Sequence, residues 1–283
     1  MDAVLLSLCS AACYGAVAVA LRSAVARDAA GGDLATLLTV LPAFAMVLAA
    51  AIFRFDFDMK GLWPFVVAGV LSPGISQTLF TLGVRDAGAA RAAVSVGTAP
   101  LFSVAIALVA LGEPIVAGVL AGAALIVGGG VLLVGEGGRP AHVKRIGLVF
   151  AVSSAVVFAT RDNLVRWLAI DSDVSPELAA AVTLGVGTLA IGTWLVVARR
   201  PISLRPLPHF APAGLLFGLS YICIFEAFYR GPVTVVSPLV ATESLWAVLL
   251  SALFLRRIEV VGARLVVGAT LVVAGGVLIG VFR

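Results

Sequence analysis

The chain has 283 residues, of which 61% are hydrophobic and only 12% charged, and its mean hydropathy is +1.15. Soluble globular domains carry about 25% charged residues, so this sequence cannot cover a water-exposed surface and most of its surface must face lipid. The formal net charge of +4 does not indicate a nucleic-acid partner, because the basic residues lie mainly between apolar runs, where they orient membrane proteins. Composition therefore excludes a soluble domain and predicts an integral membrane protein.

Apolar runs long enough to cross a bilayer recur along the whole chain. Crossing about 30 Å of hydrocarbon takes roughly 20 helical residues, and backbone groups in lipid must be hydrogen-bonded within their own segment, so each run predicts a helix. The predicted fold is an all-α integral membrane protein with ten transmembrane helices. They are expected at 3–22, 34–53, 63–83, 89–111, 115–134, 146–168, 178–197, 209–229, 233–254 and 260–281.

The longest polar interruption, 135–145, lies at the middle of the chain and separates two halves, 1–138 and 139–283. The halves resemble each other at an offset of 144 to 146 residues: segments 122–132 and 268–278 are identical at eight of eleven positions. Each predicted half holds five helices, an odd number, so a second copy must enter the membrane from the opposite side. The sequence thus predicts inverted repeats, the architecture of alternating-access carriers, with a binding site near the midplane between the halves.

Several short motifs run through most of the chain, three in the first half and three in the second. They are Tyr14-Gly15, Pro100-Leu-Phe102, Leu111-Gly-Glu-Pro114, Arg230-Gly-Pro232, Glu243 and a glycine-rich last helix. In these features the chain resembles the EamA-type ten-helix carriers of the drug/metabolite transporter superfamily. It departs from that pattern at Glu243-Ser244, where the family often has Glu-Pro, and at Arg256-Arg257, which stand in place of Gly-Glu. The resemblance implies an exporter of amino acids or similar metabolites.

Ionisable residues near the centre of a bilayer are costly, so they are candidates for function. Glu243 lies at the middle of the predicted ninth helix, where it could bind a substrate ammonium group or accept a coupling proton; a neutral, hydrogen-bonded glutamic acid is the alternative. Arg161 has no acidic partner at helical spacing and is a second candidate, unless it snorkels to the interface.

Two further acidic residues have a basic residue four positions later, the spacing at which side chains meet on one helical face. Asp162 is followed by Arg166, and Glu226 by Arg230. We expect structural ion pairs at both places.

The predicted third helix is interrupted at its middle by Ser72-Pro73-Gly74. Proline removes one backbone hydrogen bond and clashes with the preceding turn, so Pro73 and Gly74 predict a hinge that lines a cavity. Other substrate-binding candidates are polar or aromatic groups at similar depth, for several of which simple core packing is the alternative. They are Tyr14, Gln77, Ser95, Thr98, Tyr221, Thr242 and Trp246.

The motifs of other function classes are missing from the sequence. Both histidines, His142 and His209, lie in predicted loops or at a helix end, and no HExxH, G-x-S-x-G or P-loop occurs, so neither a metal nor another cofactor is expected. A secondary carrier of small molecules is the first hypothesis. The second hypothesis is an intramembrane enzyme, which would need a paired nucleophile and base that this sequence does not contain. The third hypothesis is a channel, which would show flux that does not saturate.

Glycines at Gly118/Gly122, Gly214/Gly218 and Gly276/Gly280 are spaced for close helix approach, which favours packing within a monomer over dimerisation. Ten helices place both termini on one side of the membrane. Five basic residues fall on that side and thirteen on the other, so the positive-inside rule predicts external termini, whereas the family resemblance implies cytoplasmic ones. The expected location is a bacterial-type inner membrane, crossed many times.

Overall fold

The computed structural model describes residues 3–28, 31–54, 61–99, 101–102, 105–106, 116–134, 144–169, 174–230, 236, 239–256 and 262–282, and their regular secondary structure is entirely helical. The helices are α1 (Ala3–Arg27), α2 (Gly32–Arg54), α3 (Trp63–Gly69), η1 (Val70–Ile75), α4 (Ser76–Ala87), α5 (Ala89–Val96), α7 (Ala117–Val134), α8 (Arg145–Ala169), α9 (Pro176–Val197), α10 (Leu207–Arg230), α12 (Glu243–Phe254) and α13 (Ala263–Phe282).

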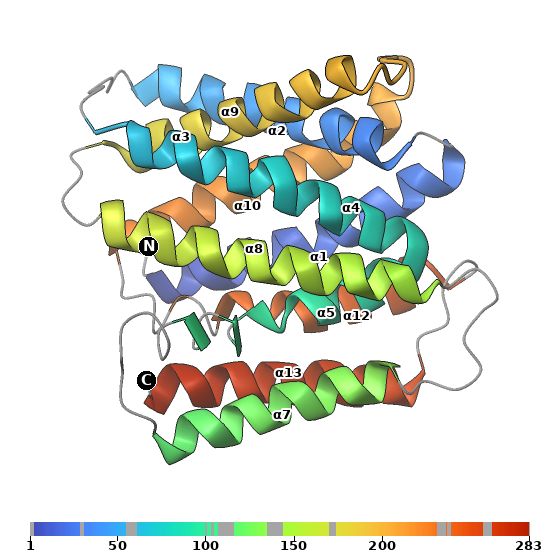
Figure 1. Cartoon of the computed structure of the whole chain (residues 1–283), viewed down its shortest axis with the longest axis vertical. Helices are drawn as coiled ribbons and strands as arrows, with labels where there is room; N and C mark the ends of the chain where they lie inside the picture. Colours follow the sequence, from blue (N-terminus) through green and yellow to red (C-terminus); the bar gives the residue numbers. More distant parts are fainter. Residues whose placement is uncertain are drawn as a thin grey trace.

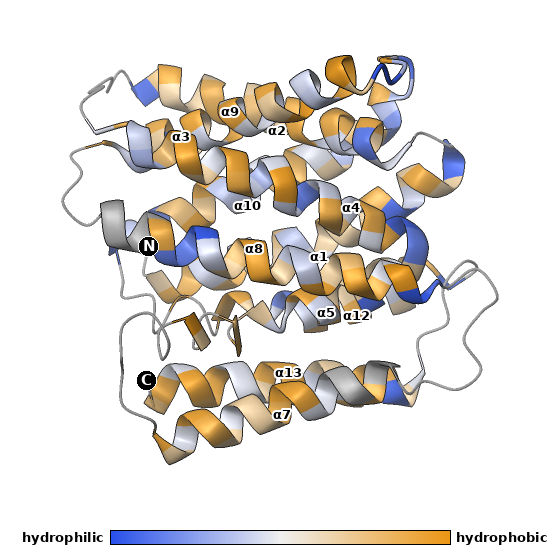
Figure 2. Ribbon diagram, in the orientation of Figure 1, coloured by the Kyte–Doolittle hydropathy of each residue, from blue (hydrophilic) through white to orange (hydrophobic). Residues whose placement is uncertain are grey.

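Seven helical stretches are long and apolar enough to cross a membrane, and they coincide with seven of the predicted spans. Two shorter apolar helices, Ala117–Gly129 and Glu243–Phe254, fall within two more. The predicted spans 89–111 and 233–254 lie partly outside the described residues. The protein is therefore a helical, multi-pass membrane protein, and Figure 2 shows its hydrophilic residues gathered mainly towards the two ends of the helices.

The third predicted span is one helical rod, Trp63–Ala87, with an irregular middle. Ser72, inside η1, leaves helical geometry (φ −145°, ψ 120°), and the η1 segment around it has π-helical hydrogen bonding. The predicted interruption at Pro73 is present, because a proline inside a helix cannot complete the backbone hydrogen-bond ladder. The rod continues beyond it as α4.

The most extensive helix contacts join a helix from residues 1–138 to one from residues 139–283. Helix α1 packs on α10 and α12, α4 on α8, α2 on α9 and α10, α5 on α12, and α7 on α13. These pairings have counterparts when the halves are exchanged: α1 on α10 corresponds to α8 on α4, and α1 on α12 corresponds to α8 on α5. The two halves thus interdigitate along their length (Figure 1).

Helices α7 and α13 form a close antiparallel pair (Figure 1). A Cβ atom added to Gly122 would lie 2.7 Å from the carbonyl oxygen of Gly275, and one added to Gly129 would lie 2.7 Å from that of Gly268. A step of seven residues forward on α7 is thus matched by seven residues backward on α13. Small residues permit such contact in lipid, where no hydrophobic force joins helices.

Two of the three predicted glycine pairs also pack inside the chain. A Cβ atom on Gly118 would meet the Phe282 ring, and one on Gly214 would lie 2.5 Å from the Thr39 carbonyl oxygen of α2. The prediction of packing within the monomer is confirmed for these positions. On α13, the glycines that approach α7 are Gly268 and Gly275, one residue before the predicted Gly276.

Ion pairs connect α2 to α9 at both of their ends. Arg54 at the end of α2 lies 3.0 Å from Glu177 in the first turn of α9, and Asp33 in the first turn of α2 lies 3.8 Å from Arg200, just after α9. The two helices are therefore antiparallel. The predicted pairing of Glu226 with Arg230 is confirmed at 2.6 Å.

Candidate functional site

A cavity of about 800 Å3, counted with its open mouth, lies among α1, the end of α5, α8, α10 and the start of α12. Both halves of the chain contribute to its wall. Its apolar lining includes Phe158, Ile224 and Phe228. Its polar side chains are Ser10, Tyr14, Arg161, Asp162, Ser220, Tyr221 and Glu243.

The cavity occupies only one half of the depth of the molecule. On α1 the lining residues are Ser10 and Tyr14, in the half nearer the N-terminus, and on α10 they begin at Ser220 and continue to Phe228. Figure 1 marks the N- and C-termini at the same end of the bundle, so the cavity extends towards that end. The opposite half is filled by fully buried side chains such as Leu21, Val84 and Phe210.

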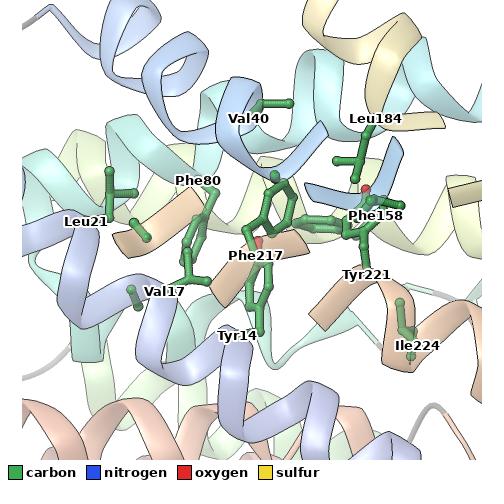
Figure 3. Packing of buried hydrophobic residues seen from close by; sticks show 14 of the residues in the cluster. Tyr14, Val17, Leu21, Val40, Phe80, Phe158, Leu184, Phe217, Tyr221 and Ile224 are labelled. Atoms are coloured by element: carbon green, nitrogen blue, oxygen red, sulfur yellow. The ribbon is translucent and has the colours of Figure 1, made fainter. Parts of the chain in front are cut away.

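An aromatic layer at mid-depth separates the cavity from the packed half (Figure 3). The Tyr14 ring lies 5.2 Å from Phe80, 6.0 Å from Phe158 and 5.8 Å from Phe217, measured between ring centroids. The Tyr14 hydroxyl donates a hydrogen bond of 3.1 Å to Oε1 of Gln77. These contacts hold Tyr14 at the inner end of the cavity.

Glu243 is buried at the cavity wall and is the first residue of α12. Its carboxylate forms no hydrogen bond or ion pair with any residue that the structure describes. Before it the chain turns at Ala241 and Thr242, and the Thr242 hydroxyl donates to the Leu239 carbonyl at 2.6 Å. Glu243 is thus an acidic group at the cavity wall that has no hydrogen-bonding or ionic partner among the described residues.

Arg161 and Asp162 form an ion pair across the cavity wall, with Nε and Oδ1 separated by 3.0 Å. The guanidinium carbon also lies 5.6 Å from the ring centre of Phe158 and 5.5 Å from that of Tyr221, a cation–π arrangement. Arg161 therefore faces the cavity and its acidic partner is the adjacent residue. The side chain of Arg166, the predicted partner of Asp162, lies outside the described residues.

The structure brings together four predicted site residues around the cavity: Tyr14, Arg161, Tyr221 and Glu243. Gln77 is fully buried behind Tyr14, and the Tyr221 hydroxyl lies 3.2 Å from Oγ of Ser72.

The three predicted hydroxyl groups bond to their own helices instead. Ser95 donates to the Arg91 carbonyl at 2.9 Å, Thr98 to the Ser95 carbonyl at 2.6 Å, and Thr242 likewise to its own segment. Their neighbours Gly97, Ala99 and Ala241 form the cavity wall.

Trp246, Pro73 and Gly74 lie away from the cavity. Trp246 is 38% exposed and its Cβ atom packs beside Gly15 of α1. Pro73 and Gly74 pack against α9, where a Cβ atom on Gly187 would meet the Pro73 ring.

Sequence reasoning missed three polar cavity residues: Ser10, Ser220 and Asp162. Ser10 lies one turn before Tyr14, a spacing that could have identified it, and its hydroxyl lies 2.9 Å from that of Ser220. Helical spacing predicts Arg166 as the partner of Asp162, whereas in the structure Asp162 pairs with the adjacent Arg161.

The sequence model of the EamA-like transporter family matches residues 1–135 of this chain and again residues 145–281, one match for each half. The chain belongs to the EamA-like transporter family.

This EamA-like chain is also similar to a solved protein crystal structure, with 23% sequence identity and a TM-score of 0.63. The superposition covers 98% of this chain and 95% of that one, so the two share a fold. No curated protein sequence matches the chain. The family is one of transporters, which makes a small molecule the expected occupant of the cavity and lipid its surroundings.

Proposed function

We propose that this EamA-like protein is a secondary carrier that exports small polar metabolites with an amine group, amino acids foremost, by alternating access. Its ten helices would form two inverted five-helix repeats, 1–138 and 139–283. The observation that carries this proposal is the charged cavity between the halves, which reaches mid-depth from one end, while the described side chains towards the other end are packed against one another. A channel would need a path through both ends.

Three features support an inverted relation between the halves. The cross-half helix pairs have counterparts when the halves are exchanged, and the α7–α13 glycines face each other in antiparallel register at equivalent positions. The third is a matched helix break, in which Thr98 bonds back to Ser95 and Thr242 bonds back to Leu239, both at 2.6 Å and both over three residues. Thr98 and Thr242 are 144 positions apart, the offset found in the sequence.

The cavity chemistry suits a small molecule with an ammonium group. Two opposite charges about 4 Å apart attract by about 4 kcal/mol at the effective dielectric of a partly buried site, so the unpaired Glu243 would bind a cation strongly. Arg161, held by Asp162 and two aromatic rings, could turn one face to a substrate carboxylate. Tyr14 and Tyr221 supply hydroxyl groups and aromatic surface for the rest of the molecule.

No nucleotide-binding motif occurs in the sequence, so the proposed driving force is a gradient of substrate or of protons. We place the carrier in a bacterial-type inner membrane. The exposed Arg199, Arg200 and Arg205 lie in the connection between α9 and α10, at the end away from the termini, and by the positive-inside rule they favour external termini, against the cytoplasmic termini that the family resemblance implies. Labelling a cysteine added after Arg283 with an impermeant reagent on intact cells tests this orientation.

Counterflow in proteoliposomes tests the function. Labelled amino acids should enter vesicles preloaded with the same unlabelled compound, with saturable rates, and Glu243→Gln should reduce the rate at least tenfold without loss of folded protein. Glu226→Gln is the matched control, because it alters an acidic residue that pairs with Arg230 outside the cavity wall. Wild-type flux in Glu243→Gln would remove that residue from the mechanism, and flux proportional to concentration would indicate a channel.

A further inference from the structure

Two serine pairs occupy equivalent places in the two halves. Ser10 of α1 donates to the Ser220 carbonyl of α10 at 3.1 Å, and Ser154 of α8 donates to the Ser76 carbonyl of α4 at 2.8 Å. Ser154 is 144 positions after Ser10, and Ser220 is 144 positions after Ser76. The same contact is therefore made twice. One copy lines the cavity, and the other is fully buried in the packed half.

The buried copy contains polar atoms that lack partners. Nε2 of Gln77 and Oγ of Ser76 are buried and have no hydrogen-bond partner among the residues that the structure describes, although Oε1 of Gln77 accepts a bond from Tyr14. Burying a polar group without a partner is unfavourable because its hydration is lost and nothing replaces it, and native structures contain few such groups. These atoms would be hydrated, or would bind a ligand, if the packed half opened.

We propose that Ser76, Gln77 and Ser154 form a second, latent half-site, which becomes the cavity wall when the carrier opens to the end away from the termini. Gln77 corresponds at the same offset to Tyr221, which lines the present cavity. In the open form, the free Gln77 amide and the two serine hydroxyls would bind neutral hydrogen-bonding groups of the substrate. This inference rests on the proposed alternating access and extends it to specific residues.

The latent half-site differs from the present cavity in charge. The residues that correspond to Arg161 and Asp162 at an offset of 144 are Val17 and Ala18, and the one that corresponds to Glu243 is Ala99. At these three positions the second half therefore carries no counterpart of the charges that line the present cavity. Because Gln77 also accepts the hydrogen bond of Tyr14, variants of Gln77 should alter the transport KM measured from both ends, with the larger change at the end away from the termini.

Side-specific cysteine labelling tests the latent half-site. The background carries alanine at the three native cysteines, Cys9, Cys13 and Cys223, and must retain counterflow. Single cysteines are placed at Ser76 or Ser154, and the reagent is a small membrane-impermeant methanethiosulfonate, added to one face of oriented proteoliposomes at a time. Because Ser154 lies on a different helix from Ser76, a folding defect in one variant does not prevent the test in the other.

Phe228→Cys and Ile75→Cys are the controls. Phe228 lines the present cavity, so its cysteine should react from the termini end alone, whereas Ile75 is 47% exposed on the outside of η1 and its cysteine should stay unlabelled in lipid. We expect cysteines at Ser76 and Ser154 to react at least tenfold faster from the opposite end, and faster still with substrate present.

Reaction of the Ser76 and Ser154 cysteines from the termini end would overturn the inference. So would an absence of reaction from both ends while Phe228→Cys is labelled. Saturable counterflow measured in the same vesicles separates the two proposals. If counterflow persists without labelling, the latent half-site is wrong and the carrier function stands, and if counterflow is absent in the wild type, the proposed function itself is wrong.

Discussion

Replacing Gly129 by alanine should weaken the pairing of α7 with α13. The added Cβ atom would lie 2.7 Å from the carbonyl oxygen of Gly268 and 2.9 Å from a methyl group of Val272, whereas ordinary contact begins at 3.4 Å. The helices must therefore separate by several tenths of an ångström, because the nearest obstacle is backbone and cannot rotate away. Overpacking of this kind costs about 1–3 kcal/mol, and in lipid no hydrophobic force compensates for lost packing.

Gly128 provides a matched control one residue away. A Cβ atom there would meet nothing within 4 Å, so Gly128→Ala removes the same glycine flexibility without a collision. Alanine is a better helix former by about 1 kcal/mol, so this variant should be as stable as the wild type or slightly more stable. Comparing the two substitutions separates close packing from helix propensity.

Thermal unfolding of the purified protein in detergent measures the difference. A loss of 1 kcal/mol lowers Tm by about 2–4 °C in chains of 150–250 residues, so Gly129→Ala should unfold about 2–12 °C below the wild type. Equal Tm values for Gly129→Ala and Gly128→Ala would refute the close approach of α7 and α13. A lower Tm for Gly128→Ala would indicate that this position packs against another part of the molecule.

Two other substitutions test the cavity and the backbone. Asp162→Asn leaves the buried Arg161 without its observed charge partner and should lower the free energy of unfolding by about 1–3 kcal/mol. This is less than the roughly 3–5 kcal/mol lost when a fully buried pair is broken, because Asp162 is partly exposed. Unfolding curves with an unchanged midpoint would contradict the pairing. Gly88→Ala places a side chain at φ 93° and ψ 163°, a conformation that essentially only glycine adopts, and should cost about 1–3 kcal/mol. Gly31→Ala, where an added Cβ atom meets nothing within 4 Å, is its control, and equal Tm values for the two would refute the strain at Gly88.

Much of the fold could be predicted because lipid imposes simple rules on a sequence. Long apolar runs identified seven spans that the structure contains, and the i, i+4 spacing identified the Glu226–Arg230 ion pair. Proline chemistry identified the interruption before Gly74. These features depend on residues close together in the chain, so local pattern and helix geometry are sufficient to find them.

The candidate site was predictable only in part, because depth in the membrane is readable from sequence but direction is not. Glu243 and Arg161 were chosen for the cost of burying a charge, and both face the cavity. Trp246 has a similar depth but is 38% exposed and does not line the cavity. Which face of α12 meets α1 depends on packing between distant segments, and no local pattern encodes it.

The sequence by itself determined that this is a helical membrane protein with a repeated half, since hydropathy and internal similarity need no knowledge of contacts. Only the tertiary structure decided which polar groups share a cavity, that Arg161 is paired with Asp162, and that Ser76 and Gln77 are buried without full hydrogen bonding. The reason is that a cavity is formed by the surfaces of five segments at once. Its composition depends on how each helix is rotated about its axis, and that rotation is set by the neighbours on which the helix packs.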